Sequence, residues 1–77
     1  MNYRDRIEIN PNILVGKPVI RGTRIPVYLI VNLVAQGQTP KTIIADYPDL
    51  IPADIQAALN FAADAINFNE ETISPPA

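Results

Sequence analysis

The chain has 77 residues, a formal net charge of −2 at pH 7, and neither cysteine nor histidine. Disulfides and thiolate zinc sites are therefore excluded, and the sequence shows neither a signal peptide nor the run of about 20 apolar residues that a membrane span needs. We expect one small cytoplasmic domain without metal, cofactor or membrane contact. Because a chain of this size has only a modest core, association with another chain is a common way for it to gain stability.

Residues 1–26 are predicted to form an N-terminal β arm. Ile7-Glu8-Ile9 alternates apolar and polar residues with a period of two, as a short strand does, and the turn residues around Pro11 end it. Residues 18–25 are predicted to form a strand or tight hairpin, in which Gly22 can take a positive φ. This second segment is expected to pair in part with residues 7–9.

Residues 27–68 are predicted to form three helices, near 27–36, 40–47 and 52–68. Pro26 suits a first helical position, and Gly37 is placed to end the first helix in a left-handed conformation. Thr39 is the predicted N-cap of the second helix. Residues 69–77 are predicted to be a flexible tail. The fold class is therefore mostly α, with a strand pair followed by a three-helix bundle.

The second and third predicted helices could form a homeodomain-like helix-turn-helix, because a short link joins them. A recognition helix brings positive charge to DNA, but the third helix carries Asp54 and Asp64 and no basic residue. Only Gln56, Asn60 and Asn67 could read base edges. A trihelical packing unit is therefore favoured over insertion of this helix into a major groove.

The third predicted helix has more apolar surface than a small core requires. One stripe contains Ile55 and Leu59, and a second stripe lies on a different face. A helix that is apolar on two faces is either buried on both or shared with a partner. The second stripe is therefore our candidate homodimer interface, and its residues are Ala57, Phe61, Ala65 and Phe68.

Three cations, Lys17, Arg21 and Arg24, lie within eight positions on a turn-rich frame. All six basic residues of the chain occur in positions 1–41, whereas residues 42–77 contain six acids and no base. Guanidinium groups bind phosphate or carboxylate through two parallel hydrogen bonds, so these three residues are the candidate contacts to a toxin or a nucleic acid. The alternative interpretation is a solvated hairpin whose glycines serve its turns.

Three acids, Asp46, Asp49 and Asp54, surround the predicted link between the second and third helices. Paired acids can hold Mg²⁺ or act in acid–base catalysis. The chain offers no histidine, no cysteine and no phosphate-binding glycine loop to support such chemistry. Helix capping and solubility explain the acids better, so we expect no enzyme and no catalytic residue.

The segment Gly-Lys-Pro-Val-Ile-Arg-Gly-Thr-Arg-Ile-Pro-Val, residues 16–27, closely resembles the bacterial and archaeal family called domain of unknown function 433. The resemblance extends over about residues 7–66. It implies a strand pair before a homeodomain-like three-helix bundle that is often dimeric. Many members are encoded beside a PIN-like ribonuclease toxin and are regarded as its antitoxin. Ile51 and Ala53 depart from the family pattern, which has a threonine and then an acid around the third helix start.

This resemblance implies an antitoxin-like module that binds and silences a PIN-like ribonuclease. Because such ribonuclease sites are acidic, Lys17, Arg21 and Arg24 would be its natural contacts. The alternative is a dimeric helix-turn-helix regulator that binds promoter DNA. An enzyme that uses the three acids is the least favoured hypothesis.

Overall fold

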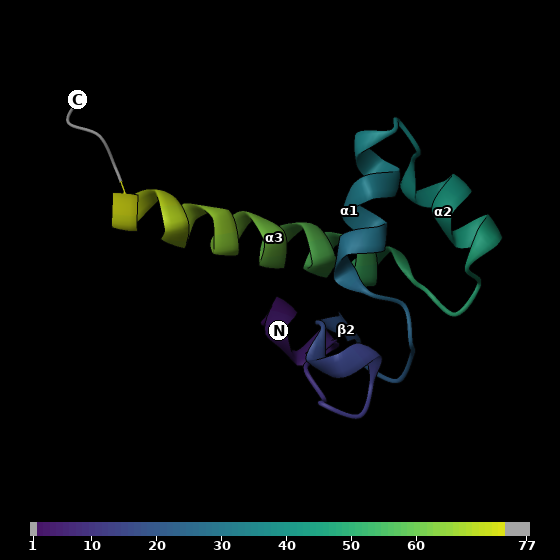
Figure 1. Cartoon of the computed structure of the whole chain (residues 1–77). Helices are drawn as coiled ribbons and strands as arrows, with labels where there is room; N and C mark the ends of the chain where they lie inside the picture. The colour runs from purple at the N-terminus through teal and green to yellow at the C-terminus, as the bar shows by residue number, and fades with distance from the viewer. Residues whose placement is uncertain (1, 74–77) are drawn as a thin grey trace.

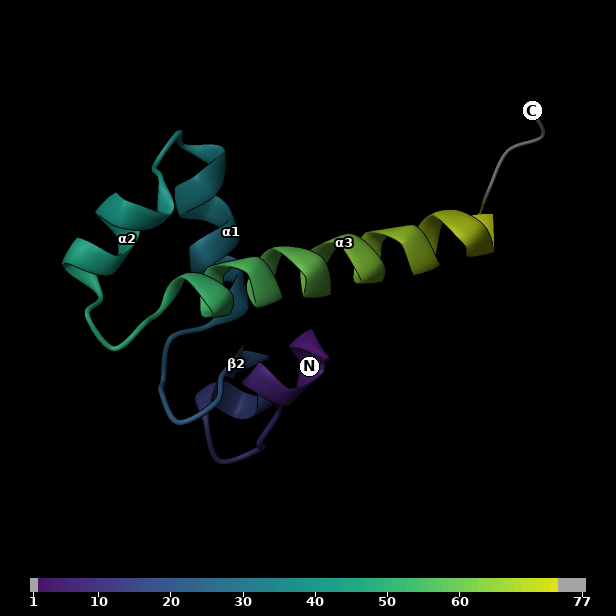
Figure 2. The ribbon, with the colours of Figure 1, turned by 180° about the vertical axis from the view of Figure 1, so that it is seen from behind.

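The computed structural model describes the backbone of residues 2–73 and the side-chain surroundings of residues 2–67. Within this span an N-terminal β arm precedes three helices, which confirms the predicted mostly α fold with a strand pair. Figure 1 shows α1 (Val27–Ala35) crossing the first half of α3 (Pro52–Ile73), with α2 (Pro40–Asp46) beside it. The reverse view in Figure 2 shows the arm and α2 on opposite sides of α3.

The arm is built on a minimal antiparallel sheet. Strand β1 (Ile7–Glu8) pairs with β2 (Val19–Ile20), with Ile7 opposite Ile20. The pairing of the two predicted segments is confirmed, although each strand is only two residues long. Gly22 takes a φ of 81° in the turn after β2, as its lack of a Cβ allows. A 3-10 turn, η1 (Tyr3–Arg6), precedes β1 and packs against α3.

A second 3-10 turn, η2 (Leu14–Gly16), lies between the two strands. Its three residues all have positive φ, at 49° for Leu14, 56° for Val15 and 79° for Gly16. Glycine adopts this region freely, whereas a β-branched residue such as valine is a clear outlier there. The arm therefore contains a strained left-handed turn that its sequence did not predict.

Helix α1 begins at Val27, as predicted, and ends at Ala35, with Pro26 as its N-cap and not its first helical residue. At the other end, the Gly37 N–H bonds to the Val34 carbonyl at 2.9 Å, and the Gln38 N–H bonds to the Leu33 carbonyl at 3.1 Å. These two bonds form a Schellman motif around Gly37, whose φ is 93°. The predicted left-handed helix end is confirmed.

Helix α2 starts at the predicted cap. The Thr39 hydroxyl accepts a bond from the Thr42 N–H at 3.3 Å, and the Thr42 hydroxyl accepts one from the Thr39 N–H at 3.0 Å. This reciprocal capping box satisfies two amide groups that have no partner inside the helix. Helix α2 ends at Asp46, and residues 47–51 lead to α3.

The core lies where α3 meets the other elements, and it draws on the arm, all three helices and the link between α2 and α3. Its buried residues are Ile7, Ile20, Val27, Ile30, Ile43, Leu50, Ile55, Ala57 and Ala58. Helix α3 continues to Ile73 rather than to the predicted Phe68. The predicted flexible tail therefore overlaps helical backbone at 69–73, and its remainder lies outside the described residues. None of the helices in the part of the chain that the structure describes is long and apolar enough to cross a membrane.

Candidate functional site

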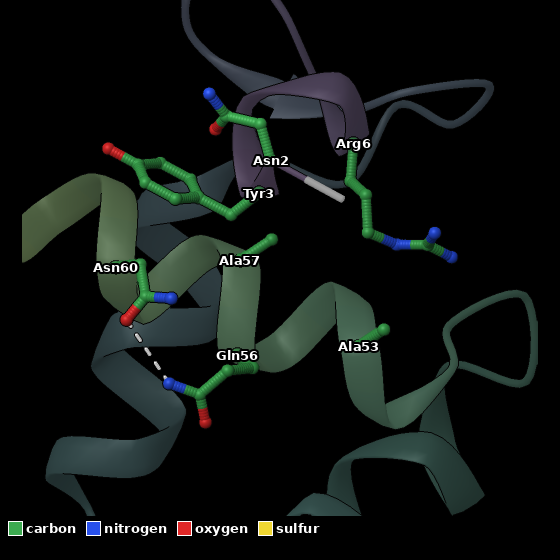
Figure 3. Close-up of a pocket in the computed structure, with 7 residues that line it drawn as sticks. All are labelled: Asn2, Tyr3, Arg6, Ala53, Gln56, Ala57 and Asn60. Atoms are coloured by element: carbon green, nitrogen blue, oxygen red, sulfur yellow. Dashed lines mark hydrogen bonds between the residues drawn. The ribbon is translucent and has the colours of Figure 1, made fainter.

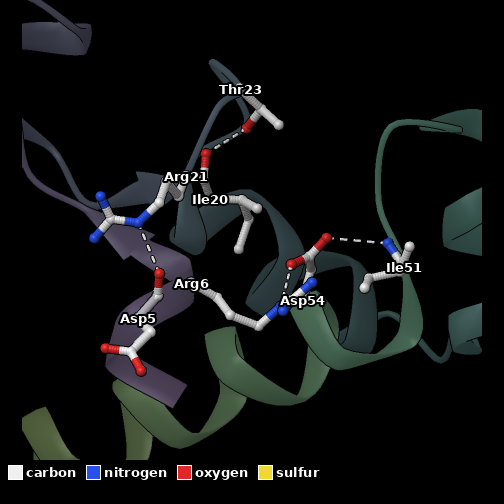
Figure 4. Close-up of polar contacts among 7 residues, drawn as sticks. All are labelled: Asp5, Arg6, Ile20, Arg21, Thr23, Ile51 and Asp54. Atoms are coloured by element: carbon white, nitrogen blue, oxygen red, sulfur yellow. Dashed lines mark hydrogen bonds and ion pairs between the residues drawn. The ribbon is translucent and has the colours of Figure 1, made fainter. Parts of the chain in front are cut away.

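An ion pair fastens the arm to the start of α3. The Arg6 Nε donates to the Asp54 carboxylate at 2.7 Å, and the two side chains are 27% and 8% exposed. The second oxygen of Asp54 accepts the Ile51 N–H at 3.0 Å (Figure 4). The Asp54 carboxylate reaches back to the Ile51 amide as the acid of a capping box does, although Ile51 has no side-chain oxygen that could accept an amide of the first turn. The arm supplies the positive charge that a nearly buried carboxylate requires.

Arg21 holds the arm together internally. Its Nε donates to the Asp5 carbonyl at 2.7 Å (Figure 4). Its Nη2 donates to the Ile7 carbonyl at 3.3 Å. Two main-chain oxygens therefore occupy part of the guanidinium that we predicted to bind a partner. Arg21 is nevertheless an exposed residue, so it combines a structural role with access to solvent.

Lys17 and Arg24 lie in surroundings that differ from those of Arg21. The Lys17 ammonium is 5.2 Å from the centroid of the Tyr28 ring on α1, within the range of a cation–π contact. Arg24 lines a hollow of about 700 Å³ between the arm and the end of α2, together with Glu8 and Asp46. The three predicted cations thus line three different hollows and do not form one cluster.

The apolar tip of the arm, defined as Leu14 and Val15, is a feature that sequence reasoning missed. Val15 is 93% exposed and Leu14 is 37% exposed. Both residues occupy the strained left-handed turn η2. The sequence Ile-Leu-Val, residues 13–15, is apolar, and the signal that could have indicated a turn there is its position between Pro11 and Gly16.

The outer side of the arm contacts α3 further along the helix. The Tyr3 hydroxyl donates a hydrogen bond to Asp64, and this bond raises the pKa of that hydroxyl above its ordinary value. Arg4 lies 3.7 Å from the same carboxylate. These exposed contacts extend the attachment that Arg6 and Asp54 make at the start of the helix.

A hollow of about 360 Å³ lies between η1 and the first half of α3 (Figure 3). Asn2, Gln56 and Asn60 bring three amide groups to its edge, and the Gln56 amide donates to Asn60 at 3.2 Å. Two of the three residues that we considered for base reading therefore bond to each other beside the arm. The third, Asn67, is exposed further along α3.

The four residues of the predicted dimer interface do not share one surface. Ala57 is only 1% exposed and belongs to the core of the single chain, so its inclusion in an exposed stripe was wrong. Phe61 is half-buried and packs against that core, whereas Ala65 is exposed. The side chain of Phe68 lies outside the described residues.

The three acids that we considered for metal binding are also separated by role. Asp54 is engaged by Arg6 and by the Ile51 amide, whereas Asp46 and Asp49 line the hollow beside Arg24. Among the described residues, no group of three acids is arranged to hold a metal ion.

Comparison with known proteins places this architecture in a family. The model of the family described as "Protein of unknown function (DUF433)" matches residues 7–62, which span the strand pair, α1, α2 and the first half of α3. The chain belongs to the DUF433 family. The resemblance inferred from residues 16–27 is thereby confirmed.

Two proteins illustrate the similarity. A DUF433 member from Anabaena variabilis ATCC 29413, known from a crystal structure, matches 94% of this chain and 71% of its own with a TM-score of 0.76 and 32% sequence identity. The uncharacterized protein y4eO of Sinorhizobium fredii (strain NBRC 101917 / NGR234) is 37% identical over 59 residues. That match covers 77% of this chain but only 27% of y4eO, so the chain spans about a quarter of that relative.

The DUF433 match includes some of the features described above and leaves out others. Lys17, Arg21, Arg24 and the apolar tip all lie within the matched residues 7–62, as does Asp54. Residues 63–73 of α3 lie beyond the matched span. The strand pair and the apolar tip therefore lie within the DUF433 match, whereas η1 and the far half of α3 lie outside it.

Proposed function

We propose that this DUF433 protein is an antitoxin-like binding module whose arm docks onto a PIN-like ribonuclease and silences it. The proposal combines the family resemblance in residues 16–27 with the shape of the arm. Silencing requires only that a bound module block access to the ribonuclease site. No chemistry by the module itself is needed, so we propose a binding role without catalysis.

The observation that carries the proposal is the exposure of Val15 on a strained backbone. A non-glycine residue in the left-handed region raises the free energy of the folded chain by about 1–3 kcal/mol. Burial within the chain does not offset this strain, because 93% of Val15 is exposed. Strain of this kind persists at ligand clamps and interaction sites, where a bound partner uses the geometry. An apolar tip suits a groove on a protein better than a phosphate backbone.

Exposed cations on the arm favour an acidic protein surface as the partner. Lys17 follows η2 directly, and Arg24 makes no hydrogen bond or ion pair with any residue in the described part of the chain. Charged groups around an apolar contact steer association and set specificity. The resemblance implies an acidic metal-binding site on the ribonuclease, and that charge is complementary to these two residues.

The test is reconstitution with a PIN-like ribonuclease encoded beside the chain. We expect a stable complex and loss of RNA cleavage when the module is added. A charge-assisted hydrogen bond contributes about 1.5–3 kcal/mol, so Arg24→Ala should weaken the complex by at least about tenfold. Lys41→Ala is the matched control, since it removes one exposed cation from α2 and not from the arm. Full cleavage in the presence of excess wild-type module would overturn the proposal.

The alternative proposal is a DNA-binding regulator, and one observation favours it. Helices α2 and α3 follow each other across residues 47–51, and the amides of Gln56 and Asn60 lie on α3 beside an open hollow. Asparagine and glutamine amides can recognise adenine through two hydrogen bonds. The acidic character of α3, with Asp54 and Asp64 and no base, opposes this role.

A DNA titration at increasing salt concentration distinguishes the two proposals. A DNA-binding module would lose affinity as salt rises, and Gln56→Ala would lower its preference for the specific sequence by about 1–3 kcal/mol. Asn67→Ala is the control, because it removes an exposed amide from the far part of α3. Binding that is equally weak for all sequences would leave only the ribonuclease proposal.

A further inference from the structure

A largely apolar groove of about 370 Å³ lies where α1 crosses the first half of α3 (Figure 1). Val27 and Val31, one helical turn apart, belong to its α1 wall, and Phe61 belongs to its α3 wall. The other α3 residues that line it are Ala62 and Ala65, whose side chains are too small to fill the space. The chain therefore leaves a groove on its surface that falls within the usual size of ligand sites, about 300–1,000 Å³.

The rim of this groove is open to solvent. Tyr28, Asn32 and Ala65 line the groove and are exposed residues, and Tyr28 has 56% of its surface exposed. A small molecule usually has about 70–90% of its surface buried in its pocket. An open groove between two helices is better suited to a helix of a larger partner, which inserts only the side chains of its apolar face.

Charge at the rim indicates what kind of helix would bind. Among the described residues that line the groove, only Lys17 is charged. Its ammonium lies 5.2 Å from the centroid of the Tyr28 ring and makes no ion pair with a described residue. A carboxylate on the bound helix would therefore meet a cation that has no acid of its own, beside an apolar surface. Hydrogen bonds between two charged groups are about twice as strong as those between neutral ones.

Lys17 also joins the groove to the apolar tip of the arm. It follows η2 directly, and its N–H bonds to the Leu14 carbonyl at 3.2 Å. A partner that contacts Leu14 and Val15 therefore reaches the rim of the groove next to them. Arg24 instead lines the hollow beside the end of α2, so Lys17 and Arg24 would contact different parts of the same partner.

We propose that the groove binds an amphipathic helix of the ribonuclease, with the apolar face of that helix against α1 and α3 and one of its acids beside Lys17. This inference rests on the proposed function and names the segment of the partner that the module holds. Apolar residues three and four positions apart on the helix fill the groove. Arg24 then remains available for the acidic site of the ribonuclease.

The fluorescent probe anilinonaphthalene sulfonate tests the groove in the free chain, because it combines apolar rings with one negative charge. We expect its fluorescence to rise on binding to the wild-type chain. Loss of a charge-assisted contact lowers affinity by about tenfold or more, so Lys17→Glu should weaken probe binding to that extent. Lys41→Glu is the control, since it makes the same change of charge at an exposed position on α2. No binding to the wild type, or equal affinity in the two variants, would overturn the proposal.

Photocrosslinking in the reconstituted complex identifies the helix. Ala65→p-benzoylphenylalanine places a photoreactive group in the groove, and Ala63→p-benzoylphenylalanine places it at an exposed α3 position that does not line the groove. We expect the first variant, and not the second, to crosslink the ribonuclease. Mass spectrometry should locate the crosslink on a helix with apolar residues three and four positions apart and an acid beside them. A crosslink to a segment without this pattern, or none from residue 65, would contradict the assignment.

Ala65→Glu distinguishes failure of this inference from failure of the proposed function. The new carboxylate would be buried without a partner against the apolar face of the helix, so the complex should weaken at least about tenfold. Ala63→Glu is the control and should bind and silence the ribonuclease as the wild type does, with equal helix content in circular dichroism. If the wild type silences RNA cleavage and both variants bind equally well, the helix proposal fails and the ribonuclease proposal stands. If the wild type forms no complex, both fail.

Discussion

The Arg6 guanidinium and the Asp54 carboxylate lie 2.7 Å apart and join two segments that are 48 positions apart in the sequence. Asp54 simultaneously accepts the Ile51 amide that opens α3. One carboxylate therefore positions the arm and completes a helix start at the same time. This Arg6–Asp54 joint therefore fixes how the exposed residues of the arm are oriented relative to α3.

Asp54→Ala should destabilise the chain severely. Removing one member of a buried ion pair leaves the other charge without its partner and typically destabilises by about 3–5 kcal/mol, and partial solvation of Arg6 reduces this to about 2–4 kcal/mol. Because small domains are stable by only about 3–5 kcal/mol, we expect substantial unfolding at 25 °C by circular dichroism. Asp49→Ala is the control and should change the free energy of unfolding by less than about 0.5 kcal/mol. Equal stability of both variants would contradict a structural role for the joint.

Val15→Asn should change the stability of the chain and its binding to the ribonuclease in opposite directions. Asparagine tolerates the left-handed region better than a β-branched residue, so the free energy of unfolding should rise by about 0.5–1 kcal/mol in urea titrations. The same change removes the apolar tip, and binding to the ribonuclease should therefore weaken. A variant that became less stable would show that the side chain packs within the chain. A variant that bound normally would remove the tip from the interface.

Ile51→Asn should stabilise the chain without affecting the partner. Ile51 is an exposed residue at the N-cap of α3, where an asparagine oxygen can accept an amide of the first turn. We expect a gain of about 0.5–1 kcal/mol in the free energy of unfolding. This variant also serves as the control for Val15→Asn, since both replace an exposed apolar residue by asparagine. Loss of ribonuclease binding in Ile51→Asn would mean that the start of α3 belongs to the interface.

Tyr3→Phe should make the free energy of unfolding fall less steeply as the pH rises above 10. The bond to Asp64 raises the pKa of the Tyr3 hydroxyl in the folded chain, so this group favours folding below the pKa it has when unfolded. Its contribution disappears as the pH rises through the raised folded value. Thermal unfolding at pH 9, 10 and 11 would show this, with Tyr28→Phe as the control. Identical pH profiles for wild type and Tyr3→Phe would contradict the assignment.

Local chemistry explains which parts of the fold could be predicted. Thr39 and Gly37 have strong positional preferences at helix ends, and both were placed correctly because capping depends on neighbouring residues. The first strand was also recognisable from its period of two, and the second from the turn that Gly22 allows after it. The surroundings of Lys17, Arg21 and Arg24 were not predictable, because turns at Gly16 and Gly22 send neighbouring side chains towards different elements.

Contacts between distant segments account for the other errors. The spacing of Ala57 and Phe61 placed them on a second apolar face of α3, but the arm and α1 both pack on this helix and bury Ala57. The partner of Asp54 could not be predicted either, since the sequence around residue 54 contains no cation. The place of Asp54 as the third residue of a helix indicated a capping role. Only the structure showed that its ion-pair partner is Arg6.

The attachment of the arm to α3 also sets the order of events during synthesis. Tyr3 and Asp64 are 61 positions apart, so the arm leaves the ribosome well before the helix that anchors it. At about 5–20 residues per second, α1 and α2 are complete about one to four seconds before residue 64 is added. The nascent arm lacks its contact with Asp64 during that interval, and chains interrupted before α3 would present its binding residues without a fixed orientation. A cell would therefore obtain working modules only from translation that passes α3, and the supply of active module would respond steeply to premature termination.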